Sequence, residues 1–514
     1  MWTCYGRGAP LRAAIYVACL SAFLFFGYDQ GVFGGLLQNK DWLDTFNHPR
    51  DVITGITVSS YCLGALFGCI LTFFIGDVLV RRQMIWLAMA LIIVGASLQT
   101  SAHSLVLLII GRVITGLGTG IDSSTVPMYQ SELAKKEVRG RLVSWEIWFI
   151  GLGITVAYWI VGPFPCMNAM WRYTDMINQD YGFSYLPGSI AWRVPIAIQL
   201  VFAVIVVFVV WGCPESPRWL AKRGREAEAV EVLCAVYDLQ PDDPYVVGEL
   251  EAIRAALAIE GKEGGNKISA LFKQDALQTR RRVILAWFGL FMNQWSGINL
   301  VVYYMPTVLV ENVGMQAHRA QLIAGFVELM FVVGNTLPAF ALDKLGRKRV
   351  MMTGCGLLSF CMLMISVLLS FGKESTSAAS IAFFFLYMLI FGATVNVVPW
   401  VWGPELLPLE ARAKGVAISV SSHWMWNFCI VMITPILINR IGWKTYLIFM
   451  ILLALFVPFV WWAYPETSGL SLEEIDNLFL PEGMKNEVVR SNSVAGYAKD
   501  VEAGEESYAY ETKA

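Results

Sequence analysis

Three amide side chains stand close together inside one long apolar run, at Asn293, Gln294 and Asn299. Amides both donate and accept hydrogen bonds, so they can replace the water that a polar, uncharged ligand sheds on binding. Gln294 and Asn299 are five residues apart with a glycine between them. That spacing can turn both amides toward one cavity, although it is not perfect helical registration. The alternative is that the amides only hydrogen-bond between packed helices.

A carboxylate occupies a second apolar stretch, at Asp29 within residues 11–35. Such a group is costly in an apolar span unless it is paired, solvated or protonated. Arg112, within the apolar residues 105–127, is its natural partner. Pairing favours the ionised carboxylate and separation favours its protonated form, so proton occupancy can be linked to conformation. The alternative interpretation is a static structural pair.

The same pattern of charged residues occurs twice, in the same order, in the two halves of the chain. The corresponding groups are Asp77, Arg81 and Arg82 with Asp343, Arg347 and Lys348; Glu132 and Arg139 with Glu405 and Arg412; and Pro214, Glu215 and Ser216 with Pro465, Glu466 and Thr467. Each group falls at an end of an apolar run, which is also where a solvated belt of charge would set the topology. The duplication favours a gate of ion pairs between helices that breaks when the protein changes conformation. It also indicates two homologous halves with a site at their interface.

The expected gate consists of Arg81, Glu132, Arg139, Glu215, Arg347, Glu405, Arg412 and Glu466.

Composition places all these residues in a membrane protein. The 514 residues are 56% hydrophobic and only 15% charged, whereas a soluble chain has roughly a quarter charged residues. Apolar runs of about 20 residues, long enough to cross a bilayer, recur along the chain. They predict about twelve spans, at 11–35, 52–76, 84–101, 105–127, 142–163, 191–212, 283–310, 321–342, 350–371, 380–403, 415–438 and 444–463. Most of the ten cysteines lie in or beside these runs, as small core residues rather than a disulfide framework.

The short loops predict the orientation. Lys and Arg concentrate in loops on one side, which also holds both termini and the long middle segment, so we expect this side to be cytoplasmic. The expected division is a first six-helix half at 1–213, a cytoplasmic linker with short helices at 214–282, a second six-helix half at 283–464, and a cytoplasmic tail at 465–514. The tail is expected to be largely disordered after about residue 482, because it has few apolar anchors.

Several motifs occur in a fixed order along residues 11–480. They are Gly27-Tyr28-Asp29-Gln30-Gly31-Val32; Gly111-Arg112 with Gly116 and Gly118; Pro127 to Glu132 followed by Arg139-Gly140; Pro214 to Arg218; Asn293 to Asn299 with Tyr303-Tyr304; Asp343 to Lys348; Pro399-Trp400 with Glu405; and Pro465-Glu466-Thr467. Together they resemble the sugar porter family of the major facilitator superfamily, especially its fungal members. The resemblance implies an all-α membrane protein with the major facilitator fold, in which about twelve transmembrane helices form two pseudo-symmetric six-helix halves.

The resemblance also implies roles for individual residues. Gln294, Asn299 and Asn293 would hold sugar hydroxyls. Trp400 would pack on the sugar ring, and Asn427 and Trp424 would line the cavity. In family members that couple transport to protons, the residue matching Asp29 takes up a proton and loosens its hold on the one matching Arg112. Members that only facilitate diffusion also keep this Asp.

The chain departs from the family pattern at several positions. Val78 and Val80 stand where the first half usually has Arg and Gly, and Ser468 stands where the last motif has Lys. Ile147, directly after Glu146, occupies the place of a sugar-binding Gln in the fifth span. The missing Gln favours a solute other than an ordinary hexose.

These features predict a secondary active transporter that moves a sugar or sugar-like solute by alternating access, with proton symport. The alternatives are an uncoupled uniporter, a carrier of an acid sugar, disaccharide or secondary metabolite, and a non-transporting nutrient sensor. An enzyme or ATP-driven pump is not expected, because the sequence has no Walker-type phosphate loop and no His-Glu-x-x-His metal site. The expected partners are a small polar solute, a proton and the lipid bilayer.

We expect no cofactor, no metal and no obligate protein partner. The net charge of −2 gives no sign of a nucleic-acid partner. The default location is the plasma membrane.

Overall fold

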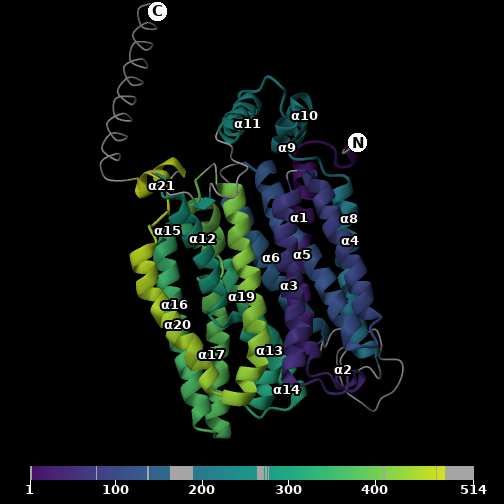
Figure 1. The fold of residues 1–514 in the computed structure, drawn as a ribbon, viewed down its shortest axis with the longest axis vertical. Coiled ribbons are helices and arrows are strands. Elements are labelled where there is room, and N and C mark those ends of the chain that lie inside the picture. The colour runs from purple at the N-terminus through teal and green to yellow at the C-terminus, as the bar shows by residue number, and fades with distance from the viewer. Residues whose placement is uncertain are drawn as a thin grey trace, which may run out of the picture.

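Two bundles of long helices stand side by side in the computed structural model, and short helices cover one end of them (Figure 1). The structure describes residues 3–76, 78–135, 138–161, 189–262, 271–272, 275, 277–408, 411–470 and 472–480. The predicted disordered tail after about 482 and the motif residue Asp77 lie outside these described residues.

The first bundle consists of continuous helices. They are α1 (Ala9–Leu36), α3 (Asp51–Ile75), α4 (Arg81–Thr100), α5 (Leu105–Leu133), α6 (Arg139–Val161) and α8 (Ile190–Trp211). At 1.5 Å of rise per residue, each is long enough to cross a hydrocarbon core of about 30 Å. The short helix α2 (Lys40–Thr45) follows α1 and is capped by the Asn39 side chain, which accepts a hydrogen bond from the Trp42 backbone N–H.

The second bundle repeats this order, but several of its spans are broken. Its helices are α12 (Thr279–Gln294) with α13 (Ile298–Glu311), α14 (Ala317–Thr336) with α15 (Pro338–Leu345), α16 (Arg347–Ser370), α17 (Glu374–Ala393) with α18 (Val398–Leu406), α19 (Arg412–Ile441) and α20 (Lys444–Ala463). The break after α12 turns at Gly297, whose φ of 97° suits glycine. The bend of 49° after α14 comes at Pro338, which has no backbone N–H to donate.

Among the described residues, ten helices are long and apolar enough to cross a membrane, and the bent α14–α15 pair makes eleven. The broken pair α12–α13 is the remaining span of the second bundle. The protein is therefore an all-helical, multi-pass membrane protein with two six-span halves, as the sequence predicts. The span predicted at 283–310 consists of two helices, because the chain turns between Gln294 and Ile298.

Corresponding helix pairs pack in both bundles. In the first half α5 packs on α3 and α4, and in the second half α17 packs on α14 and α16. Glycines allow the closest approach: a Cβ on Gly116 or Gly120 would lie 2.0 Å from the Tyr61 or Ala65 carbonyl oxygen of α3. Between the halves, α1 meets α13, α3 meets α19, and α6 meets α14. We call this inter-half contact the seam.

The short helices α9 (Pro217–Lys222), α10 (Glu226–Tyr237) and α11 (Pro244–Lys262) lie between the two halves in sequence and at one end of the bundles in space (Figure 1). Helix α21 (Leu472–Phe479) lies at the same end. We call this end the linker end, and the opposite end, which carries α2, the distal end.

Candidate functional site

A small cavity lies on the seam, walled by α1 and α6 of the first half and by broken spans and α19 of the second. Its polar wall residues are Gln30, Asn293, Gln294, Asn299, Asn396, His423 and Asn427. Its volume is about 40 Å³, far below the roughly 300 Å³ or more of a typical small-molecule site. The cavity as it stands has less room than such a ligand needs, so binding requires the surrounding helices to move apart.

The amide cluster owes its geometry to the break in the seventh span. Gln294 ends α12 and Asn299 lies in the first turn of α13, and the Asn299 Nδ2 donates to Gln294 Oε1 at 2.5 Å. Gln294 Nε2 in turn donates to Asn293 Oδ1 at 2.9 Å and lies 2.8 Å from His423 Nδ1. All three predicted amides thus reach one cavity, and they do so because the helix turns at Gly297 rather than through helical spacing.

Of the other residues predicted to contact the solute, two lie in the cavity wall and one does not. Trp400 and Asn427 are in the cavity wall, with the Trp400 ring centroid 5.1 Å from that of His423. Trp424 lies beside the cavity rather than in its wall. It packs on the Phe26 ring at 5.2 Å, and its indole N–H donates to Ser123 Oγ at 3.4 Å.

Sequence reasoning did not assign three polar residues to the wall: His423, Gln30 and Asn396. His423 precedes Asn427 by one helical turn of α19, so the helix period was a signal for it. Gln30 follows Asp29 directly and lies one turn after the wall residue Phe26. Asn396 lies in the break between α17 and α18, which the sequence pattern did not reveal.

Asp29 and Arg112 lie within ion-pair distance, but loosely. Arg112 Nη1 is 3.9 Å from Asp29 Oδ1, and both side chains are fully buried. The Gln199 Nε2 donates to the same Asp29 oxygen at 2.6 Å. Arg112 Nη2 donates to the Val58 carbonyl at 3.0 Å, and its guanidinium lies 3.8 Å from the centroid of the Phe33 ring. The pair can therefore separate without either side chain losing all its contacts.

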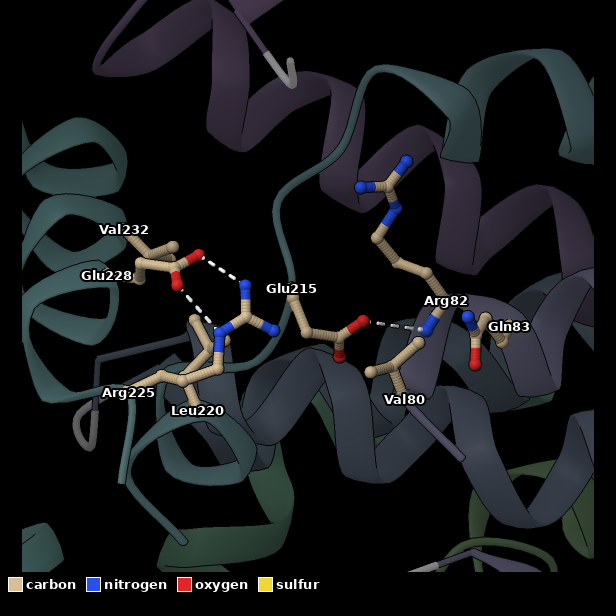
Figure 2. A pocket seen from close by; sticks show the side chains of 8 residues that line it. All are labelled: Val80, Arg82, Gln83, Glu215, Leu220, Arg225, Glu228 and Val232. Carbon is tan, nitrogen blue, oxygen red and sulfur yellow. Dashed lines mark hydrogen bonds and ion pairs between the residues drawn. The ribbon is translucent and has the colours of Figure 1, made fainter. Parts of the chain in front are cut away.

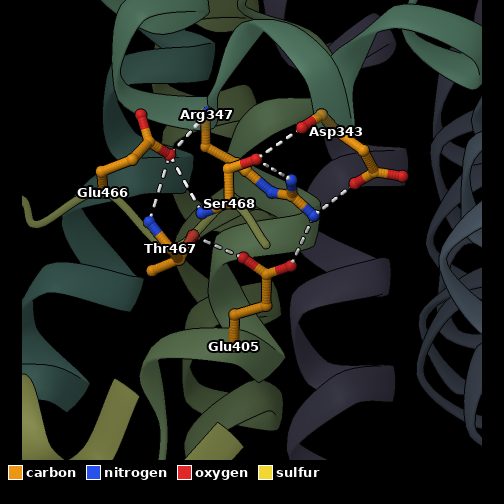
Figure 3. Close-up of polar contacts among 6 residues, drawn as sticks. All are labelled: Asp343, Arg347, Glu405, Glu466, Thr467 and Ser468. Carbon is orange, nitrogen blue, oxygen red and sulfur yellow. Dashed lines mark hydrogen bonds and ion pairs between the residues drawn. The ribbon is translucent and has the colours of Figure 1, made fainter. Parts of the chain in front are cut away.

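The second-half charged motif forms a network at the linker end (Figure 3). Arg347 Nη2 is 3.1 Å from Glu405 Oε1 and 2.7 Å from Asp343 Oδ1. The Glu466 carboxylate accepts from the backbone N–H groups of Arg347 at 2.8 Å and Lys348 at 3.2 Å. A carboxylate at this position is favoured because it complements the free N–H groups at the start of α16.

The first half has an equivalent network. Arg81 Nη2 lies 3.4 Å from Glu132 Oε1, and Glu215 accepts from the backbone N–H groups of Arg81 at 2.9 Å and Arg82 at 3.3 Å. Burial raises the pKa of Glu215, and its hydrogen bonds from Ser216, Arg82 and Arg81 oppose that rise. The Arg81–Glu132 pair joins α4 to α5, and the Arg347–Glu405 pair joins α16 to α18, so each of these ion pairs lies within one half.

A cleft of about 280 Å³ adjoins Glu215, between the start of α4 and helices α9 and α10 (Figure 2). At its edge Arg225 forms an exposed ion pair with Glu228 at 2.6 Å.

Two further residues of the predicted gate are Arg412 and Arg139. Arg412 Nη2 donates to the Leu407 carbonyl at 3.2 Å, and the side chain of Arg139 lies outside the described part of the chain.

Two pseudo-symmetric six-span halves around a central polar cavity define a carrier of the major facilitator type. The chain matches the model of the family described as sugar (and other) transporter over residues 14–479. It is 35% identical over 506 residues to the MFS-type transporter oryC of Aspergillus oryzae, covering 96% of this chain and 88% of that protein. The chain therefore belongs to the sugar porter family of the major facilitator superfamily.

The chain is also similar to a second fungal transporter and, in fold, to a solved structure. The chain is 32% identical over 486 residues to the sugar transporter STL1 of Saccharomyces cerevisiae, covering 92% of this chain and 82% of that protein. The fold matches the proton:xylose symporter XylE, solved with 6-bromo-6-deoxy-D-glucose, with a TM-score of 0.74 at 23% identity. That match covers 92% of this chain and 100% of XylE, and it shows the fold.

Proposed function

We propose that this sugar porter carries a neutral, polyhydroxylated solute together with a proton by alternating access. The observation that carries the proposal is the composition of the cavity wall. Among the described residues, that wall contains amides, an imidazole and an indole but no Asp, Glu, Lys or Arg. Amides that both donate and accept match hydroxyl groups, and the Trp400 ring offers an apolar face for a sugar ring.

The uncharged wall also discriminates among solutes. An acid sugar would need a cationic partner to replace its hydration, usually Arg or Lys. Ile147, the residue that raised the non-hexose alternative, is buried and lies outside the cavity wall, whereas Ile150 and Ile154 of the same helix lie in it. The apolar surface of α6 therefore favours a neutral solute with an apolar side. A sugar or polyol fits this description better than an acid.

Proton coupling is assigned to Asp29 and Arg112. Asp29 adjoins the wall residue Gln30 in α1, so movement of α1 on solute binding reaches the pair directly. A protonated Asp29 no longer attracts the guanidinium, and the long 3.9 Å separation makes the pair easy to open. The name of a solved structure with the same fold, a proton:xylose symporter, supports coupling to a proton.

Alternating access requires the seam to open on one side of the cavity at a time. At the distal end, Gln38 Nε2 donates to Thr307 Oγ1 at 3.0 Å and Gln321 Nε2 to the Gly35 carbonyl at 3.0 Å. Toward the linker end, Trp148 Nε1 donates to Thr336 Oγ1 at 3.1 Å. In the proposed cycle residues 1–213 and 283–464 rock about the cavity while the linker 214–282 joins them. We assign the protein to the plasma membrane with both termini cytoplasmic.

The proposal is tested by uptake of labelled sugars and polyols in a yeast strain that lacks hexose transport, with and without an uncoupler. We expect concentrative uptake of a neutral solute that the uncoupler abolishes. Uptake that is indifferent to the uncoupler and to external pH would identify an uncoupled uniporter. Uptake restricted to acid sugars would contradict the assigned solute class.

A further inference from the structure

A second buried carboxyl group lies on the seam, outside both the cavity wall and the Asp29 pair. Glu328 belongs to α14 of the second half, and its side chain is fully buried. Neither of its carboxylate oxygens has a hydrogen-bond partner. Its backbone carbonyl accepts a bond of 3.1 Å from Thr155 Oγ1 of α6, in the first half. Glu328 therefore stands where the two halves touch.

The contact between α6 and α14 extends on both sides of Glu328. Along α6, Trp148 bonds Thr336 at 3.1 Å, a Cβ on Gly151 would lie 2.8 Å from Asn335 Nδ2, and the ring centroids of Trp159 and Phe326 are 5.0 Å apart. These residues recur every three or four positions, so they form one face of α6. Separation of the halves along this face exposes Glu328 to water.

The described surroundings of Glu328 offer it no counter-charge. From α6 the titratable neighbour is Tyr158, which is close enough to feel the carboxylate charge, but its hydroxyl donates to the Val302 carbonyl at 2.7 Å. The described residues include no basic side chain that acts on the Glu328 carboxylate. The other titratable groups of the helices packed on α14, and of α14 itself, are Tyr303, Tyr304, Glu311, Tyr387, Glu374, Asp343, Lys344, Glu146, Arg139, Arg141, His318 and Arg319.

A carboxylate with neither a hydrogen-bond donor nor a counter-charge is very unfavourable in such a site, whereas the neutral acid is tolerated. We propose that Glu328 is a second proton-binding site, protonated while the α6–α14 seam is closed and able to ionise when the seam opens to water. On opening, the carboxyl O–H bond breaks and the proton passes to water on the open side. On closing, the carboxylate takes a proton from water before it is buried again.

This inference rests on the proposed alternating access, because it needs a seam that opens. It differs from the role of Asp29 in its physical cause. Asp29 responds to the distance of a counter-charge, Arg112, within one half, whereas Glu328 responds to hydration at the boundary between halves. Since ionised Glu328 resists closure, alkaline pH should slow the closing step, and a neutral side chain should remove that sensitivity.

Glu146 provides a matched control. It is also a buried glutamate with an unpartnered oxygen, and it lies on the same seam helix, α6. It precedes Thr155 by nine residues, about two and a half turns, so it lies on the opposite face of α6 from Glu328. Neutralising Glu146 removes a buried acid without touching the seam.

The first measurement is infrared spectroscopy of the full-length protein in lipid nanodiscs. We expect a carboxylic-acid C=O band that E328Q removes, and we expect part of that band to change when a transported solute is added. The E146Q protein should keep the solute-dependent part. A band that E328Q leaves intact, or a Glu328 band that does not respond to solute, overturns the proposal.

The second measurement is solute exchange across proteoliposomes over a range of pH. Wild-type exchange should fall at alkaline pH, E328Q should lose that fall, and E328D should restore it. Exchange by E146Q should follow the wild-type profile. The same alkaline fall in E328Q as in the wild type contradicts the proposal. A wild-type protein that moves no neutral solute would overturn the proposed function instead, and it would leave the protonation of Glu328 measurable in the infrared spectrum.

Discussion

The two halves share one topology, yet they place different chemistry at the seam. In the described structure the second half supplies the polar cavity groups Asn293, Gln294, Asn299, Asn396, His423 and Asn427, while the first half supplies Gln30 alone. The buried pair Asp29–Arg112 belongs entirely to the first half. The described first-half spans are unbroken, whereas second-half spans break beside Gln294 and Asn396. On this difference we propose that the second half recognises the solute and that the first half senses charge at Asp29.

The substitution D29N is expected to have the largest effect. It removes the charge that holds Arg112, so accumulation driven by a pH gradient should be lost while solute exchange at equal concentrations persists. Accumulation and exchange are measured on the same proteoliposomes. An unchanged gradient of solute would contradict the division of roles, because the first half would then not carry the coupling.

The substitution Q294A tests the second half. It removes one cavity ligand and leaves Asn299 Nδ2 without its acceptor, so solute affinity should fall about tenfold, as expected for the loss of a buried hydrogen-bonding group. Coupling to protons should remain. The control is Q278A, at the linker end, where the amide bonds the Phe479 carbonyl at 2.7 Å. Wild-type affinity in Q294A would remove this residue from the site.

The two charged networks at the linker end are the feature that the halves share, and substitutions there test whether the networks are equivalent. R347A and R81A remove equivalent arginines from the networks around Glu466 and Glu215. Both arginine side chains are largely buried. Glu466 and Glu215 keep their bonds from backbone N–H groups in the variants, so we expect each substitution to change the turnover rate by about threefold. Solute affinity should be unaffected. A tenfold larger effect in one half would show that the networks are not equivalent.

The smallest effect is expected for R254A. Its guanidinium pairs with Glu226 at 2.6 Å across the exposed surface of α10 and α11, and its hydrogen bond lowers the pKa of Glu226. The pair therefore stabilises the fold above the unfolded-state pKa of Glu226 and loses this contribution as pH falls through the lowered value. Transport and melting temperature at neutral pH should match the wild type. A clear loss of transport would give the linker helices a direct role.

The sequence predicted the elements that depend on composition and repetition. Long apolar runs predict the spans because a bilayer requires about 20 apolar residues, and duplication of the motifs around Arg81 and Arg347 predicted the two halves. Ion pairing of Asp29 was predictable because a charge in a span needs a partner. None of these inferences required knowledge of tertiary contacts.

The rest depended on local backbone geometry that hydrophobicity does not encode. The apolar run 283–310 predicted a span but not the break within it. Gly297 adopts a positive φ, and that turn brings Gln294 and Asn299 together. Trp424 was expected in the cavity wall. Its ring instead packs against the rings of Phe26 and Tyr61, which belong to the other half. The position of Glu328 could not be assigned either, because the facing helix α6 is distant in sequence.

A structure determined with a transported neutral solute tests the central claim most directly. The account predicts that the solute lies between the halves, with its hydroxyls on Gln294 and Asn299 and its apolar face on Trp400. A solute bound elsewhere, or held by charged side chains of the first half, would contradict it.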